Sequence, residues 1–430
     1  MSANPQEAFL AQIGHVAAAL LCLGTSSVAL SSSPSKLQVG QNLLQRCLQQ
    51  EADREGLSGA VLVSANNQTL ASIVRGRRAD ETSSAIDSRT RFNLGSASKM
   101  FTAVAIGQLV ARNKLSLDQP VGQIVRGLTP EASNVTIRQL LTHTAGLGDF
   151  FRPKNMQAML KARSAADILP LIAADKPRFP PGSKFSYSNS GFALLGIVIE
   201  RVSGMTYGQY LQTHVFGPAG MTSTGLDPKP LATLAVGMTA GGMSMPPPDQ
   251  RLVLIGPDGK PLPVSTQPPA DAQGLKLIGP GKRPINSSRA DGSNELSPAP
   301  GSTEGYGSPA GGLFSTTEDM HRFAVALLDG KLLPPAMAHT FTTAQVEAAP
   351  PEAGRPARQY GFGFTVGDSG GLIWFGHGGG TLGANAEFAV QPDHQWVVSV
   401  LSNRDPPVAT NIMRWTTTWL TSRHDTETCS

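Results

Sequence analysis

The chain of 430 residues is poor in cysteine and in charge, and it holds no long apolar run. Its three cysteines and eight histidines show neither Cys-x-x-Cys nor His-Glu-x-x-His spacing, so we expect no metal site. Charged residues make up 15%, and a net charge of +4 without a basic run does not indicate nucleic acid as a partner. No apolar segment reaches the roughly 20 residues of a membrane-spanning helix, so we expect no integral membrane segment.

The first 30 residues have several features of a secretory leader. Residues 16–23 form an apolar core, and Ser27-Val28-Ala29 is a small-x-small cleavage candidate. No Lys or Arg precedes the core, and Glu7 is acidic, which leaves an uncleaved leader as the alternative. We predict a leader over residues 1–30 and a periplasmic or secreted protein, with a cytoplasmic location as the alternative.

Cleavage of such a leader would remove Cys22 and leave Cys47 and Cys429. An even pair in an oxidising compartment can form a disulfide. Against this, a cysteine in a helical run such as Cys47 is more often a small buried apolar residue, and Cys429 lies in a polar tail, residues 426–430. Whether the two cysteines pair stays open at the level of the sequence.

A serine and a lysine lie one helical turn apart at Ser96 and Lys99. Apolar residues recur at helical spacing from 100 to 111, which predicts an amphipathic helix that begins near Ser96 and carries Lys99 on the same face. A serine hydroxyl is a weak nucleophile until a base takes its proton, and a buried lysine with a lowered pKa can be that base. Alone, the pattern is also that of a helix cap beside a surface lysine.

A second cluster, Tyr187-Ser188-Asn189, follows a Pro-Pro-Gly turn and precedes an apolar helix over residues 192–202. Residues at i and i+2 of an extended segment project to the same side, so Tyr187 and Asn189 can face one cleft. The tyrosine can act as a general base or a proton relay if cationic neighbours favour its phenolate, and the asparagine can donate to a substrate carbonyl and accept from a lysine. The alternative is a helix cap, at Asn189 or Ser190, beside a packed tyrosine.

The third cluster runs from Gly376 through His377, Gly378 and Gly379 to Gly380, between β-rich segments. Repeated glycine in a strand indicates the close approach of a ligand or of another backbone. A backbone N–H of this strand and that of Ser96 could form an oxyanion hole. The alternative is a glycine-rich hairpin with a solvent-facing histidine.

In this order and at these separations, the three clusters resemble the serine β-lactamase and penicillin-binding protein superfamily, in particular its class C-like branch. Residues 140–147, which include His143 as a structural residue, and residues 309–316 resemble segments that frame the motifs of that branch. The similarity runs from about Leu43 to Leu420.

The resemblance implies that Ser96 is the acylated nucleophile, that Lys99 and Tyr187 share the work of the base, and that Asn189 orients Lys99 and the substrate. Gly380 would supply the second oxyanion-hole N–H beside that of Ser96, and no metal or organic cofactor is needed. Two departures concern the substrate. His377 stands where many relatives carry lysine, and Gly378 replaces a hydroxyl residue that holds a substrate carboxylate, so the strand formed by His377, Gly378 and Gly379 binds an anionic substrate less well.

The resemblance also implies an α/β fold, in which an antiparallel sheet built from both chain ends is flanked by helices and joined to a mostly helical region. We expect strands at 59–63 and 69–74 and four more near Tyr360, Ile373, Phe388 and Val397, in a catalytic domain over 31–425. Helices 37–55 and 408–421 should pack on one face of the sheet. The helical region should cover about 118–306.

The segment from about 238 to 307 concentrates glycine and proline and lacks a sustained apolar period, which predicts a long loop. Gly256-Pro257-Asp258-Gly259 predicts a turn between strands at 252–255 and 261–264. Such a loop can border the active site or be a surface excursion, and both interpretations remain open.

We therefore predict a serine hydrolase that forms an acyl-enzyme with a small ester or amide. The alternatives are D-Ala-D-Ala carboxypeptidase, β-lactamase or D-aminopeptidase activity on a peptide or β-lactam. A different class, a weakly active binding or filament-forming homologue, is disfavoured because a binding module has no need of Lys99 beside Ser96. The sequence does not indicate an oligomeric state.

Overall fold

The computed structural model describes residues 36–79, 84–152, 155–239, 253–255, 276–279, 283–284, 296–299, 302, 307–350, 357–369, 371–393, 395–421 and 429. The chain divides into two units, Met1–Gly40 and Gln41–Ser430. The predicted leader and Cys22 lie outside the described residues. Every feature of the site belongs to the second unit.

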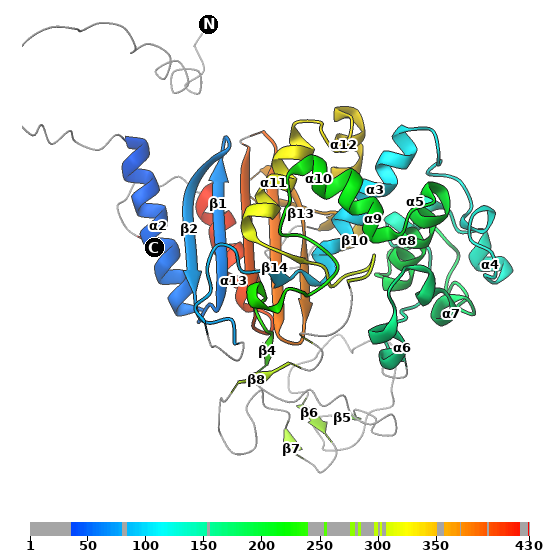
Figure 1. Ribbon diagram of the computed structural model, residues 1–430, viewed down its shortest axis with the longest axis horizontal. Coiled ribbons are helices and arrows are strands. Elements are labelled where there is room, and N and C mark those ends of the chain that lie inside the picture. The colour runs from blue at the N-terminus through cyan, green and yellow to red at the C-terminus, as the bar shows by residue number, and fades with distance from the viewer. Residues whose placement is uncertain are drawn as a thin grey trace, which may run out of the picture. The chain divides into compact units, whose positions relative to one another are not determined.

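The described strands form one large antiparallel sheet of eight strands in the order β10-β11-β12-β13-β14-β15-β1-β2. The first strand of the sheet along the chain pairs with the last one, since Gly59 lies opposite Ser402. The predicted sheet from both chain ends is thus confirmed (Figure 1). The strands are β1 (Gly59–Ala65), β2 (Gln68–Arg75), β10 (Val346–Ala349), β11 (Arg358–Tyr360), β12 (Thr365–Ser369), β13 (Leu372–Thr381), β14 (Ala384–Gln391) and β15 (Trp396–Ser402).

The stretch predicted as a single strand near Tyr360 forms two strands, β11 and β12. A turn separates them at Gly361-Phe362-Gly363, where Gly363 adopts a φ of 78° that other residues rarely adopt. The alternating pattern of the sequence continues across this turn, so it did not reveal the break.

Helices α2 (Lys36–Arg54) and α13 (Val408–Thr421) cover one face of the sheet, as predicted. Side chains of both helices join one buried cluster with the strands, among them Leu44 and Ile412. Cys47 of α2 forms a disulfide with Cys429, 382 residues further along the chain. The question that the sequence left open is therefore answered by a covalent bond between the two ends of the domain.

The other face of the sheet packs against a second and larger buried cluster. At its centre lies α3 (Lys99–Ala111), which is buried from Lys99 to Leu109. The predicted amphipathic character of this helix is wrong, because α3 is enclosed by other elements on all sides. Its neighbours include α8 (Asn189–Ser203) and α12 (Pro335–Thr342). It also contacts α11 (Thr317–Leu328), because the ring of Phe101 packs against that of Phe323.

The described residues of the predicted helical region contain α-helices as far as Ala219. Beyond that point, the described residues up to 302 include a 3-10 helix, Leu231–Thr233, and short strands, and most of residues 240–306 lie outside the described residues. The helices are α4 (Pro130–Ser133), α5 (Ile137–Leu141), α6 (Met156–Lys161), α7 (Leu169–Ile172), α9 (Tyr207–Leu211) and α10 (Gly217–Ala219).

Short strands of the described chain complete the fold. β3 (Phe92–Asn93) pairs with β9 (Phe314–Ser315), and β4 (Met238–Thr239) pairs with β8 (Ser297–Pro298). β5 (Val253–Ile255) pairs with β6 (Lys276–Gly279), which pairs with β7 (Arg283–Pro284). The predicted partner of β5, residues 261–264, lies outside the described residues, as does most of the predicted loop at 238–307.

None of the helices within the described ranges is long and apolar enough to cross a membrane.

We expect Cys47→Ser to lower the free energy of unfolding by about 2–5 kcal/mol, because the disulfide restricts the unfolded chain over nearly its whole length. Denaturant unfolding of the oxidised protein measures the change, and Cys429→Ser should lower the free energy of unfolding by a similar amount, because it removes the same bridge. Thiol counting under denaturing, non-reducing conditions should find Cys47 and Cys429 unreactive. Two titratable thiols at these positions would contradict the bridge.

Candidate active site

Ser96 lies in a short 3-10 helix, Gly95–Ser98, that leads directly into α3. Gly95 begins this turn with a φ of 48°, and a Cβ atom there would lie 2.9 Å from the backbone nitrogen of Gly380. Glycine is therefore required both by the backbone conformation and by the approach of β13. The hydroxyl of Ser98 donates to the Gly95 carbonyl, which fixes the turn that presents Ser96.

Lys99 is fully buried, and its amine contacts three oxygen atoms. Nζ lies 3.1 Å from Ser96 Oγ and 2.8 Å from Asn189 Oδ1, and it also donates to the carbonyl of Ala310. Burial lowers the pKa of Lys99 to about 7, although the negative charge of Asp149 opposes the shift. A neutral amine has two N–H groups and one lone pair. The carbonyl oxygens of Asn189 and Ala310 take the two N–H groups, so the lone pair faces the hydroxyl of Ser96.

Asp149 is a residue of this site that the sequence analysis missed. Its Oδ2 accepts a hydrogen bond of 2.8 Å from Asn189 Nδ2. This bond turns the amide so that Oδ1, and not Nδ2, faces Lys99. In the sequence, Asp149 could have been noticed because it lies two residues after the framing segment 140–147. A single carboxylate in a loop, however, does not show which residue it binds.

Tyr187 completes the group, since its hydroxyl is hydrogen-bonded to the Ser96 side chain. Ser188, and not Asn189 or Ser190, is the N-cap of α8, so Tyr187 lies just outside the helix. The side chain is 39% exposed, yet burial around the hydroxyl raises the pKa of Tyr187. The condition that cationic neighbours favour a phenolate is therefore not met, because desolvation dominates. The structure presents Tyr187 as a neutral phenol, which can donate a proton to a leaving group.

A chain of hydrogen bonds lies beside Tyr187. The N–H of Ser188 donates to His143 Nδ1 (3.1 Å), so neutral His143 carries its proton on Nε2 and donates it to the hydroxyl of Tyr360 (3.2 Å). The hydroxyl of Tyr360 then donates to His377 Nε2 (3.0 Å), and Nδ1 of His377 donates to the carbonyl of Gly378 (2.5 Å). Every donor in this chain, which we call the histidine relay, thus has an acceptor.

The relay gives His377 a role that the sequence did not predict, and it specifies the contacts of His143, which we expected to be structural. His377 is 5% exposed, and both of its ring nitrogens are engaged, so it is neither the solvent-facing histidine of the alternative interpretation nor a free group for binding substrate. Burial, together with the nearby charge of Lys99, lowers the pKa of His377 to about 3. The His143 ring lies against the ring of Tyr187, with centroids 4.2 Å apart, and so helps to position that phenol.

The glycines of β13 allow this strand to approach the turn that carries Ser96. A Cβ atom on Gly379 would lie 2.0 Å from the Leu94 carbonyl oxygen and 2.7 Å from the Ser96 nitrogen. Gly380, next along the strand, borders the same cavity as Ser96, as the oxyanion-hole expectation requires.

Gly378 does not fit its expected role in substrate binding. A side chain there would point at the carboxylate of Glu387, 2.8 Å away, which is hydrogen-bonded to Thr410 of α13. The position faces α13, and not the cleft, because successive residues of a strand point to opposite sides.

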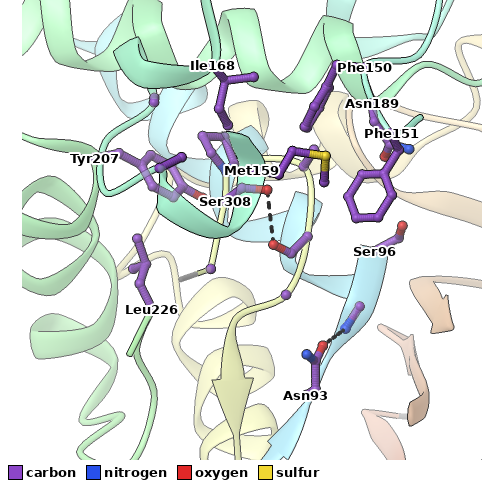
Figure 2. A pocket seen from close by; sticks show the side chains of 18 of the residues that line it. Asn93, Ser96, Phe150, Phe151, Met159, Ile168, Asn189, Tyr207, Leu226 and Ser308 are labelled. Carbon is purple, nitrogen blue, oxygen red and sulfur yellow. Dashed lines mark hydrogen bonds between the residues drawn. The ribbon is translucent and has the colours of Figure 1, made fainter. Parts of the chain in front are cut away.

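A cavity of about 530 Å³ opens at Ser96 and is bordered by Asn93, Asn189 and Gly380 (Figure 2). Among the described residues, no group of three or more His, Cys, Asp or Glu side chains is placed to hold a metal ion.

Comparison with known proteins places these residues in a known family. The family model described as Beta-lactamase matches residues 44–422. Penicillin-binding protein 4* of Bacillus subtilis (strain 168) is 36% identical over 137 residues, which cover 31% of this chain and 30% of that protein. The chain spans about a third of the length of the first curated relatives that it matches.

Two solved structures share the fold. The penicillin-binding protein from Bacillus halodurans has a TM-score of 0.66 and 27% identity, with 85% of this chain and 97% of that one covered. A D-stereospecific amidohydrolase from Streptomyces sp. has a TM-score of 0.60 and 24% identity, with 87% and 97% covered. At the latter identity the likeness concerns the fold alone.

We expect Gly379→Ala to slow the labelling of Ser96 by a fluorophosphonate by about 100-fold or more, because the added methyl group forces β13 away from the oxyanion site. Intact-mass analysis over time measures the labelling rate. Gly225→Ala is the matched control, since a Cβ atom there meets nothing within 4 Å. If Gly379→Ala is labelled at the wild-type rate and its circular dichroism spectrum is unchanged, the close approach of β13 to the turn that carries Ser96 is contradicted.

Proposed function

The chain belongs to the beta-lactamase family, and on this premise we propose that it hydrolyses small uncharged esters and amides through an acyl-enzyme on Ser96. The protein is a serine hydrolase by its family, and the choice of substrate is our proposal. The observation that carries the mechanism is the buried amine of Lys99, with its two N–H groups engaged and its lone pair toward Ser96 Oγ.

In the acylation step, Ser96 Oγ attacks the carbonyl carbon of the substrate while Lys99 Nζ takes the hydroxyl proton. The backbone N–H groups of Ser96 and Gly380 hold the oxyanion of the tetrahedral intermediate. Tyr187 passes a proton to the leaving alcohol or amine and is reprotonated from Lys99, so that the bond to the leaving group breaks and Lys99 is neutral again. Asp149 acts through Asn189 and is a positioning residue.

In the deacylation step, a water molecule attacks the acyl carbonyl carbon and gives a proton to Lys99, which again acts as the base. The bond to Ser96 Oγ breaks, the serine recovers a proton, and the carboxylic acid leaves. No group outside the described side chains and water is needed to balance either step.

The preference for uncharged substrates is supported by the state of His377. A relative with lysine at this position has a fixed positive charge for a substrate carboxylate, whereas His377 is neutral and has no free N–H. One charge-assisted hydrogen bond is worth about 1.5–3 kcal/mol, so its loss reduces the affinity for an anionic substrate about 10- to 100-fold. This disfavours β-lactams and D-Ala-D-Ala peptides.

We also propose that the protein works in the periplasm or outside the cell. The disulfide between Cys47 and Cys429 supports this location, because such bonds persist in oxidising compartments and are rare in the cytoplasm.

The test of the proposed function compares Ser96→Ala with the wild type on p-nitrophenyl butyrate and nitrocefin. We expect the wild type to hydrolyse the ester with the higher kcat/KM, and Ser96→Ala to lose at least about 1,000-fold on the ester, because the nucleophile is gone. A fluorophosphonate should label the wild type once, on Ser96. An adduct on another residue, or an equal kcat/KM for nitrocefin, would contradict the mechanism or the substrate class, respectively.

The pH dependence of kcat/KM should report Lys99. Because only the neutral amine accepts the serine proton, kcat/KM should fall about tenfold per pH unit below about pH 7 and level off above about pH 8. Asp149→Asn should move the midpoint to lower pH, because the carboxylate that favours the ammonium is removed. Asp118→Asn, an exposed carboxylate paired with Arg138, is the control and should leave the midpoint unchanged. A flat profile would exclude Lys99 as the base.

A further inference from the structure

The cavity of about 530 Å³ that opens at Ser96 continues well beyond the reacting atoms. Cavities of roughly 300–1,000 Å³ accommodate ligands of drug size, so this one is larger than an acetyl group requires. Six large side chains line its length, and Figure 2 shows them around the cavity. We call this space the acyl pocket, and it is defined by Phe150, Phe151, Met159, Ile168, Tyr207 and Leu226.

The walls of the acyl pocket are mostly apolar, although polar residues such as Ser164 and Thr206 also border the cavity. Tyr207 presents only its ring, because its hydroxyl lies 2.7 Å from Thr102 Oγ1, which donates onward to the carbonyl of Pro309. Phe151 is 53% exposed, which is unusual for a large apolar side chain and leaves its ring available to a ligand. Ligand binding in this pocket is therefore favoured chiefly by the burial of the ligand's apolar surface.

The charged residues that border the pocket have partners. Of its described lining residues, Arg163 and Glu200 are the charged ones. The carboxylate of Glu200 accepts from three backbone N–H groups, those of Ala165, Ala166 and Tyr207. Arg163 donates to the carbonyl of Ala162. Glu200 is thus engaged within the protein, and Arg163 is an exposed side chain at the border of the pocket.

The position of Tyr187 indicates which end of the substrate enters the pocket. Tyr187 contacts the Ser96 side chain but does not line the acyl pocket. A leaving group that takes its proton from Tyr187 departs on that side, where the phenol is partly exposed to solvent. The acyl group then lies on the other side of Ser96, between Phe151 and Leu226.

We propose that the acyl pocket makes this enzyme selective for esters and amides of neutral, medium-length aliphatic or phenylalkyl carboxylic acids, with little selection on the leaving group. This inference rests on the proposed function, since it requires an acyl-enzyme on Ser96. It adds the chemical class of the acyl group, which neither the motifs nor the family determine.

The first experiment measures kcat/KM for p-nitrophenyl acetate, butyrate, hexanoate, octanoate and palmitate. We expect a rise of up to about three- to fourfold per added methylene group until the pocket is filled, with a maximum at hexanoate or octanoate and a fall at palmitate. Alkyl acetates of increasing alcohol length should show little change. A maximum at acetate, or a preference that follows the alcohol, would overturn the proposal.

The second experiment fills the pocket. Leu226→Trp and Met159→Trp should lower the ratio of kcat/KM for octanoate to kcat/KM for acetate at least about tenfold, so the maximum moves to a shorter chain. Leu231→Trp is the matched control, because Leu231 is 45% exposed and does not line the pocket, and its profile should equal that of the wild type. An octanoate-to-acetate ratio that stays unchanged in both pocket variants would place the acyl chain elsewhere.

A third measurement does not depend on the folding of a variant. Alkylboronic acids form a reversible adduct with a catalytic serine, and the inhibition constant of the wild type should fall from methyl- to hexylboronic acid. Equal inhibition by the two would contradict the acyl pocket. Failure of the proposed function is distinguishable, because it would appear as hydrolysis that survives Ser96→Ala, whereas failure of the pocket would appear as Ser96-dependent hydrolysis without a chain-length preference.

Discussion

The burial of one amine is the constraint on which the rest of this structure depends. Lys99 has no exposed surface, and a protonated amine in such a place is costly unless every N–H group has an acceptor. Desolvation lowers its pKa to about 7, so that the proton can leave at neutral pH. The same burial requires α3 to be enclosed on all sides, which explains why this helix is apolar beyond one face. In the mechanism that we propose, the base therefore belongs to α3, the helix at the centre of the hydrophobic core.

Three elements from distant parts of the chain keep that amine in position. Asn189, at the start of α8, and the carbonyl of Ala310 supply acceptors, and Asp149 holds the Asn189 amide in the required orientation. Because Asn189 follows the cap residue Ser188, the beginning of α8 determines where its side chain lies. The helix cap, which depends on neighbouring residues alone, thus positions Asn189 for its contact with Lys99, a residue far away in the sequence.

The strand that carries His377 contributes by its backbone more than by its side chains. Gly379 allows β13 to lie against the turn at Ser96, and the histidine relay engages both nitrogens of His377. As a result, the site holds a neutral group where relatives with lysine hold a charge. Together with the apolar walls of the acyl pocket, this makes the cleft suitable for an uncharged acyl group.

The sequence by itself determined the elements whose signals are local. The spacing of Ser96 and Lys99, the turn before Tyr187 and the glycines around His377 identified the motifs, and the family resemblance that these motifs carry implied most of the strands. Only the tertiary structure decided what depends on contacts between distant residues. The pairing of Cys47 with Cys429, the role of Asp149, the neutral state of Tyr187 and the engaged nitrogens of His377 all belong to this second group. The physical reason is that burial and hydrogen-bond partners set pKa values and free donors, and both are properties of the packed chain that no local pattern encodes.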